Sequence, residues 1–103
     1  MKSILFLAIT ATAMSANAGW FLKRHTGTLT STSNHYHCSF KNKTNNSLDM
    51  KYVVFYMDST FDKGGSTTQQ DRIDHVIRSG ESAKYSMEKP VHYTVSHCTY
   101  LAR

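Results

Sequence analysis

The chain of 103 residues contains two cysteines, Cys38 and Cys98, whose spacing constrains the fold more than any other sequence feature. Two cysteines allow one intramolecular bridge, so no choice of connectivity arises. Such a bridge closes a loop of about sixty residues, and the chain-entropy argument gives it a stabilisation of about 4 kcal/mol, from which native strain subtracts. A covalent link suits a small chain, which buries only about 60–65% of the surface that it exposes when unfolded. Two separate thiols or an intermolecular link are the alternatives.

The first 18 residues predict a leader that is removed on export. Lys2 precedes the apolar stretch Ile4–Met14, and Ser-Ala-Asn-Ala then ends in the Ala-x-Ala pattern of a signal-peptide cleavage site. The apolar stretch is too short to cross a bilayer, so we expect no transmembrane segment in the mature chain. We therefore expect a signal peptide over residues 1–18, a single domain over residues 19–103, and a secreted or periplasmic location in which the cysteines can pair.

The charge balance argues against a dedicated nucleic-acid face. The chain has 12 Lys and Arg against 7 Asp and Glu, and the basic residues are scattered along it. This excess predicts a weak attraction to anionic surfaces. A nucleic-acid face needs basic residues that are clustered.

The sequence after the leader predicts strands almost throughout. β-Branched and aromatic residues are plentiful, and no stretch repeats apolar residues at helical spacing for three turns. The segment 59–70 is polar and long for a connection, so we expect a mobile loop there. Short strands separated by polar turns, with a bridge from an early strand to the last one, predict an all-β fold, an antiparallel β-sandwich. The expected strands are Phe21–Thr30, His35–Lys41, Leu48–Asp58, Arg72–Arg78, Ala83–Met87 and Val91–Leu101.

The expected strand Leu48–Asp58 is apolar on both faces, which predicts a central position in its sheet. Its alternate residues Val53 and Phe55 share one face, which we expect to face the core. Tyr52 and Tyr56 then lie on the outer face and are the predicted partner-binding residues, because tyrosine gives an interface large area at small conformational cost. The alternative is that these rings belong to the core. Two other tyrosines are candidates for extending the patch: Tyr85 and Tyr93.

The last expected strand requires an irregularity. In a regular strand Val95 and Cys98 point to opposite faces of the sheet, although both side chains are suited to the core. Both can face inward if a β-bulge lies near Ser96 and His97. We therefore predict a bulge at this position.

Six histidines follow the leader, and three of them suggest a metal site. His35 and His37 point to the same side of an expected strand. His37 precedes Cys38 as His97 precedes Cys98. If the bridge joins these strands, His35, His37 and His97 can form a three-imidazole site for zinc or copper. The alternative is that these are exposed histidines on the outer face of a sheet. The reserve ligands are His92 and His75.

Motifs for catalysis are missing, and apart from the possible zinc or copper we expect no cofactor. The sequence has no Gly-x-Ser-x-Gly elbow and no glycine-rich phosphate loop after a strand. We expect no enzymatic activity. The alternative is a small basic secreted enzyme or toxin acting on nucleic acid or cell-wall polymer, with two imidazoles as acid and base.

From Cys38 onward the chain reads Cys-Ser-Phe-Lys-Asn, a polar turn, the strand Lys51–Met57, a glycine-containing loop, and Ile-Arg-Ser-Gly-Glu-Ser-Ala-Lys-Tyr ending at Tyr85. This layout resembles the small immunoglobulin-like sandwich domains of bacterial envelope and secreted proteins. The resemblance covers about fifty residues and carries over no functional residue. It implies an immunoglobulin-like sandwich that acts as a binding or accessory module, through contacts with a protein or an envelope component.

Overall fold

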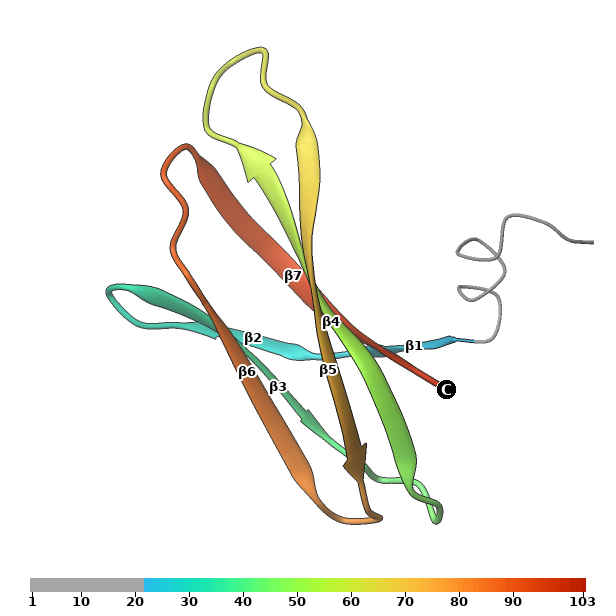
Figure 1. Cartoon of the computed structure of the whole chain (residues 1–103). Coiled ribbons are helices and arrows are strands. Elements are labelled where there is room, and N and C mark those ends of the chain that lie inside the picture. Colours follow the sequence, from blue (N-terminus) through green and yellow to red (C-terminus); the bar gives the residue numbers. More distant parts are fainter. Residues whose placement is uncertain (1–21) are drawn as a thin grey trace, which may run out of the picture.

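The structure is a computed structural model that describes residues 22–103. The predicted signal peptide and its cleavage site lie outside the described residues. The described part is all-β and forms two antiparallel sheets (Figure 1). Within it, no helix has the length and apolar character needed to span a membrane. The strands are β1 (Lys23–Thr26), β2 (Thr28–Ser31), β3 (His35–Lys41), β4 (Leu48–Ser59), β5 (Ser66–Ile77), β6 (Ser82–Glu88) and β7 (Tyr93–Ala102).

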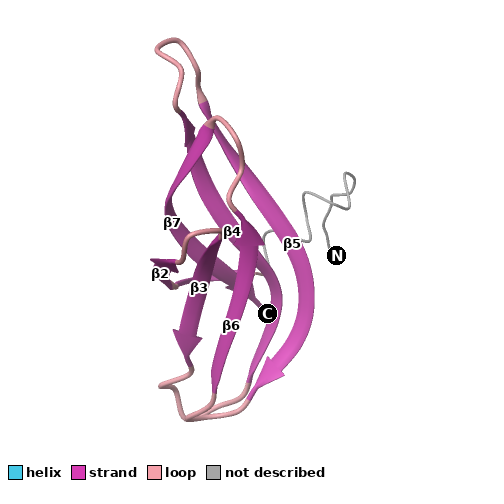
Figure 2. Ribbon diagram, turned by 90° about the vertical axis from the view of Figure 1, so that its left-hand side faces the viewer, coloured by secondary structure: helices cyan, strands magenta, loops and turns pink. Residues whose placement is uncertain are grey.

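Strands β1-β7-β4-β5 form the four-stranded sheet, and β2-β3-β6 form the three-stranded sheet (Figure 2). Neighbouring strands in both sheets are antiparallel. The chain changes sheet after β1, β3, β5 and β6. Residues close in the sequence are therefore often carried onto different layers.

The core lies between the two sheets, and β4 contributes to it as the alternation predicts. Val53, Phe55 and Met57 are buried, whereas Tyr52 and Tyr56 are half-buried on the opposite face. The inward face of β4 is therefore confirmed. The other buried members of the core cluster are Cys38, Met50, Ile77, Ala83, Met87, Val95, Cys98, Tyr100 and Ala102.

A disulfide between Cys38 of β3 and Cys98 of β7 links the two sheets through the core, with the Cα atoms 6.1 Å apart. The predicted bridge is confirmed. Gly27 lies against it, at the point where the chain leaves β1 for β2, and its N–H donates to the carbonyl of Cys98 at 3.1 Å. A Cβ at Gly27 would overlap the Sγ of Cys38 and approach that of Cys98 to 3.0 Å. The close approach of the backbone to the bridge therefore requires glycine here.

Strand β3 matches its expected range, but the structure corrects two other expectations. The stretch 21–30 was expected as one strand, whereas the described part of it is divided at Gly27 into β1 and β2, which join different sheets. The segment 59–70 was expected as a mobile loop, whereas β5 begins at Ser66 and pairs with the second half of β4. Polar residues form this strand because ladder hydrogen bonds use backbone groups, and an exposed edge tolerates polar side chains.

The bulge predicted in the last strand is confirmed. Tyr56 pairs with His97 but Met57 pairs with Val95, so Ser96 is the extra residue in β7. This extra residue lets Val95 and Cys98 both face the core, where both are buried.

Candidate binding surface

The outer face of the four-stranded sheet carries both predicted partner-binding residues. Tyr56 of β4 stacks on His97 of β7, with ring centroids 4.3 Å apart and the planes at 8°. The two residues are register partners, so adjacent strands hold the rings side by side. The hydroxyl of Thr99 donates to the Tyr56 hydroxyl at 3.4 Å. The Tyr56 ring therefore has a defined orientation although it lies at the surface.

A pocket of about 270 Å³ lies beside this stack, between β4, β5 and β7. Its wall combines the Tyr56 and His97 rings with hydroxyl groups and one carboxylate. The Asp58 carboxylate accepts a hydrogen bond from the Ser66 hydroxyl at 2.6 Å. At the bulge, the Ser96 hydroxyl lies 2.9 Å from His97 Nδ1. The pocket thus offers ring surface together with hydrogen-bonding groups, which is a combination suited to binding a polar ligand or a partner side chain.

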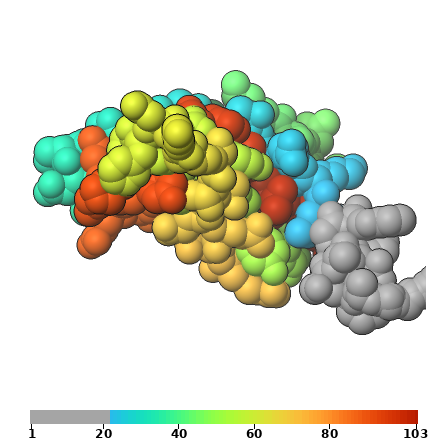
Figure 3. All heavy atoms as spheres, turned by 90° about the horizontal axis from the view of Figure 1, so that it is seen from above, coloured from blue at the N-terminus to red at the C-terminus, as the bar shows by residue number. Residues whose placement is uncertain are grey.

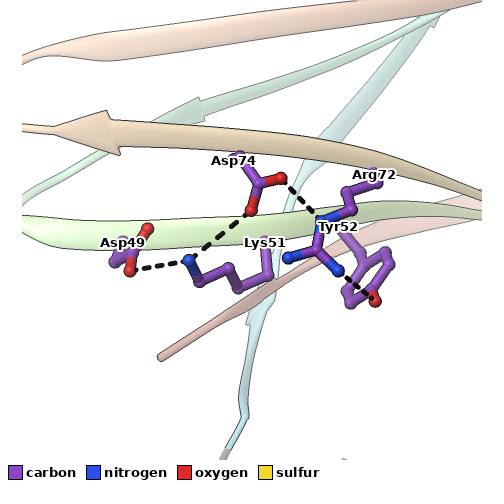
Figure 4. Close-up of polar contacts among 5 residues, drawn as sticks. All are labelled: Asp49, Lys51, Tyr52, Arg72 and Asp74. Atoms are coloured by element: carbon purple, nitrogen blue, oxygen red, sulfur yellow. Dashed lines mark hydrogen bonds and ion pairs between the residues drawn. The ribbon is translucent and has the colours of Figure 1, made fainter.

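The second tyrosine of this face belongs to a polar network (Figure 4). The guanidinium of Arg72 lies 5.5 Å from the Tyr52 ring centroid, and its Nη1 donates to the Tyr52 hydroxyl at 3.2 Å. Arg72 Nε donates to Asp74 at 2.6 Å. Lys51 lies 3.5 Å from Asp74 and 3.0 Å from Asp49. The network orients Arg72 against the Tyr52 ring and leaves both at the surface.

The local backbone brings Asp74 into this network. The β4–β5 register shifts between Met50 and Tyr52, and Asp74 has a φ of 44°, in the left-handed region. Asp is among the residues that tolerate this region best. The hydrogen bond from Arg72 lowers the pKa of the Asp74 carboxyl, and the same bond raises the pKa of Arg72. Both groups are therefore ionised at neutral pH.

Tyr85 does not extend this surface, which corrects one expectation. It lies on β6, its ring packs against Tyr100 at a centroid distance of 6.2 Å, and its hydroxyl lies 2.9 Å from His75 Nδ1. The sequence did not show that β6 belongs to the other sheet. Tyr85 of β6 therefore contacts His75 of β5 and so links the two sheets.

Tyr93 is the first residue of β7 and directly follows the β6–β7 connection. Figure 3 views the end of the molecule where this orange connection adjoins the yellow β4–β5 connection. Tyr93 pairs with Ser59, which has the parity of the inward-facing residues of β4. It therefore does not extend the outer face either. Phe61 stacks on His92 here at a centroid distance of 4.6 Å, and the N–H of Thr60 donates to the carbonyl of His92.

The structure does not bring the three predicted metal-binding histidines together. Cys38 and Cys98 meet between the sheets, so the preceding residues, His37 and His97, point away from each other on opposite outer faces. His35 remains beside His37, with ring centroids 6.2 Å apart. Among residues 22–103, no three His, Cys, Asp or Glu side chains are grouped so as to hold a metal ion. The reserve ligands, His75 and His92, also lie in separate places.

Sequence reasoning missed the residues that hold the two tyrosines. Arg72 could not be paired with Tyr52 because the length and register of β5 were not recognised. A usable signal existed for His97, since the predicted bulge already placed it on the face opposite Cys98. Tyr56 also points outward, and the pairing of β4 with β7 in the structure then places both rings on one face.

No protein-family model matches this sequence, and neither a curated protein nor a solved structure matches it. No residue role can be transferred from a relative.

Proposed function

We propose that the chain is a non-enzymatic binding module, secreted or periplasmic, that contacts a protein or an envelope component through the outer face of its four-stranded sheet. The observation that carries the proposal is that two surface tyrosines are each held by a partner, Tyr56 by His97 and Tyr52 by Arg72. A side chain that is already ordered loses less entropy on binding. Tyrosine and arginine are also enriched among the residues that dominate binding energy.

An immunoglobulin-like topology is part of this proposal. The bridge from β3 to β7 joins the two sheets in the way that the B–F bridge joins those of an immunoglobulin domain. In that scheme β2-β3-β6 correspond to strands A-B-E, and β7-β4-β5 to F-C-C′. Phe55, the register partner of Cys98, lies where those domains carry a tryptophan against the bridge. β1 lies on the free side of β7, where those domains place their last strand.

The proposed location draws support from the cysteines. Disulfides persist in oxidising compartments and are rare in the cytosol. In the described residues Cys38 and Cys98 are paired and no cysteine is free. Fractionation of cells that express the full chain tests the location, and recovery of the protein in the cytosol with both thiols reduced would contradict it.

The binding surface is tested with the exported, disulfide-bonded protein. Tyr52→Ser combined with Tyr56→Ser removes both rings, and we expect retention on the binding fraction to weaken at least about tenfold. The fractions to compare are isolated membranes, purified peptidoglycan, and the soluble proteins of the same compartment. Circular dichroism and thermal unfolding should match those of the unmodified protein, because both tyrosines are only half-buried.

Tyr93→Ser is the matched control, because Tyr93 is 38% exposed but lies at the end of the molecule. We expect it to leave retention unchanged. Equal loss in the control and the double variant would argue against the outer face as the contact. Unfolding of the double variant would instead assign the two rings a structural role and remove the basis of the proposal.

A further inference from the structure

A hollow of about 470 Å³ opens beside the end of β3, where the chain passes from β1 to β2. The ladder between β2 and β3 ends at the pair Thr28 and Ser39, because the chain leaves for the other sheet at Gly27. The last residues of β3 therefore have no β2 residue opposite them, and the hollow occupies this gap. Its lining residues are Thr26, Thr28, Ser39, Phe40, Lys41 and Lys43.

The lining of this hollow combines hydroxyl and ammonium groups with one aromatic ring and contains no carboxylate. A smaller hollow shares four of these residues and adds the hydroxyl of Ser82. Lys41 and Lys43 are exposed, and within residues 22–103 no carboxylate lies within 4.0 Å of either ammonium group. The pocket beside Tyr56, by contrast, contains the Asp58 carboxylate. The hollow near Lys41 is therefore positive and rich in hydrogen-bond donors, which suits an anion.

The backbone that carries both lysines is fixed by the residue between them. Asn42 is fully buried, and its side-chain nitrogen donates to the carbonyls of Asn46 at 2.8 Å and Ile77 at 2.9 Å. The backbone N–H of Asn42 donates to the carbonyl of Glu81 at 2.8 Å. The side chains of Lys41 and Lys43 thus start from ordered positions, so binding a ligand does not require the backbone to be ordered first.

A phosphate monoester is the anion that this lining fits best. At neutral pH it carries between one and two negative charges, which two ammonium groups can balance, and its three terminal oxygens accept several hydrogen bonds. Lysine binds phosphate as a point charge, and the hydroxyls of the cross-strand partners Thr28 and Ser39 can donate as well. The Phe40 ring offers apolar surface to the carbon skeleton of the ester. The volume also lies within the range of about 300–1,000 Å³ that is typical of small-molecule sites.

We propose that this hollow binds the phosphate monoester of a small organic group, with Lys41 and Lys43 on the phosphate and Phe40 against the organic part. The same chemistry occurs in soluble phosphate esters and in the headgroup of phosphatidic acid. The hollow shares no lining residue with the pocket beside Tyr56, so either proposal can fail alone.

The test is a titration of glycerol 3-phosphate into the disulfide-bonded protein near neutral pH, followed by amide NMR, with sodium chloride keeping the ionic strength constant. We expect saturable shifts at Thr28, Ser39 and Lys41. Lys41→Gln combined with Lys43→Gln should weaken binding at least about tenfold, because two charged donors are lost. The charge-matched control is Lys63→Gln combined with Lys89→Gln, in the β4–β5 and β6–β7 connections, and it should bind as the unmodified protein does.

A substitution that leaves the charge unchanged tests the geometry of the hollow. Thr28→Val removes one lining hydroxyl and should weaken binding about two- to tenfold. Thr30→Val is the matched control, because Thr30 is exposed on the same strand but does not line the hollow, and it should have no effect. Equal losses in the two lysine pairs, or equal losses in the two threonine variants, would overturn the proposal. Shifts that sodium chloride alone reproduces would also overturn it.

Vesicles that contain phosphatidic acid, compared with vesicles of phosphatidylcholine alone, separate the two sources of the ester. Sedimentation with the phosphatidic acid vesicles that is lost in Lys41→Gln/Lys43→Gln assigns the site to a lipid headgroup. Binding of glycerol 3-phosphate without sedimentation assigns it to a soluble ester. Absence of both would overturn the proposal.

Discussion

The interior around the disulfide and the outer face around Tyr56 both consist of rings held by specific partners, but they differ in their access to water. In the interior, Tyr100 is fully buried and its hydroxyl donates to the backbone carbonyl of Cys38. Burial raises the pKa of the Tyr100 hydroxyl, so the group stays neutral. On the outer face, water can replace any contact that Tyr56 loses. We therefore expect the interior to contribute more to stability than the outer face does.

Loss of the disulfide should have the largest effect on the free energy of unfolding. Cys38→Ala combined with Cys98→Ala should lower the free energy of unfolding by about 4 kcal/mol, because the unfolded chain regains the entropy of a loop with a sequence separation of 60. Urea denaturation followed by circular dichroism measures this change. His97→Ala on the outer face should cost less than about 1 kcal/mol in the same assay. A bridge-free protein as stable as the original would show that the core holds the sheets together without it.

A smaller loss is expected where the chain passes the bridge. Gly27→Ala places a methyl group on the Cys38 sulfur, and the displacement of the bridge or of β1 should cost about 1–3 kcal/mol. Gly65→Ala is the matched control, because a Cβ there meets nothing within 4 Å. Thermal unfolding of the two variants should therefore separate clearly. Equal melting temperatures would mean that the close approach at Gly27 is not needed for the fold.

Removal of one hydroxyl from each region compares them directly. Tyr100→Phe leaves the ring in place but removes the donor to the Cys38 carbonyl, which should cost about 1–2 kcal/mol. Tyr52→Phe removes a surface hydroxyl that accepts from Arg72, and solvent can replace that contact. We expect almost no change in the urea midpoint for Tyr52→Phe. A larger loss for Tyr52→Phe than for Tyr100→Phe would reverse the assignment of the two regions.

The smallest effect concerns pH. Since the bond from Arg72 lowers the pKa of Asp74, ionised Asp74 favours the folded state above its ordinary pKa of 3.8, and this contribution disappears as the pH falls through the lowered value. The melting temperature of Asp74→Asn should therefore lie slightly below that of the unmodified protein at pH 7, and the two should converge in acid. Asp62→Asn, in the β4–β5 connection, is the control for the loss of one carboxylate at pH 7. The difference should also shrink in high salt, because the groups are exposed.

Residues with strong alternation were placed correctly from the sequence. The inward face of β4 followed from parity, and the bulge in β7 followed from the need to bury both Val95 and Cys98. The disulfide followed from the number of cysteines and the expected export. These inferences succeeded because burial and covalent geometry restrict them locally.

The inferences that failed required knowledge of which sheet each strand joins. Polar Ser66 to Gln70 gave no local signal of a strand, since their pairing with β4 uses backbone groups. His37 and His97 each lie beside a cysteine, and the sequence could not show that the two cysteines face each other from opposite layers. The predicted site of His35, His37 and His97 is therefore not formed in the structure. Arg72 was likewise unassigned, because its position against Tyr52 depends on the β4–β5 register.

The placement of the bridge has a mechanical consequence when the chain is pulled at both of its ends. Tension applied to the two flanks of the Cys38–Cys98 loop passes through the sulfur–sulfur bond, so the segment between the cysteines is shielded from the load. The flanks that can yield are β1, β2, the residues of β3 before Cys38 and the last residues of β7. If β1 is peeled from β7, strands β7, β4 and β5 stay paired and the stack of Tyr56 on His97 is kept.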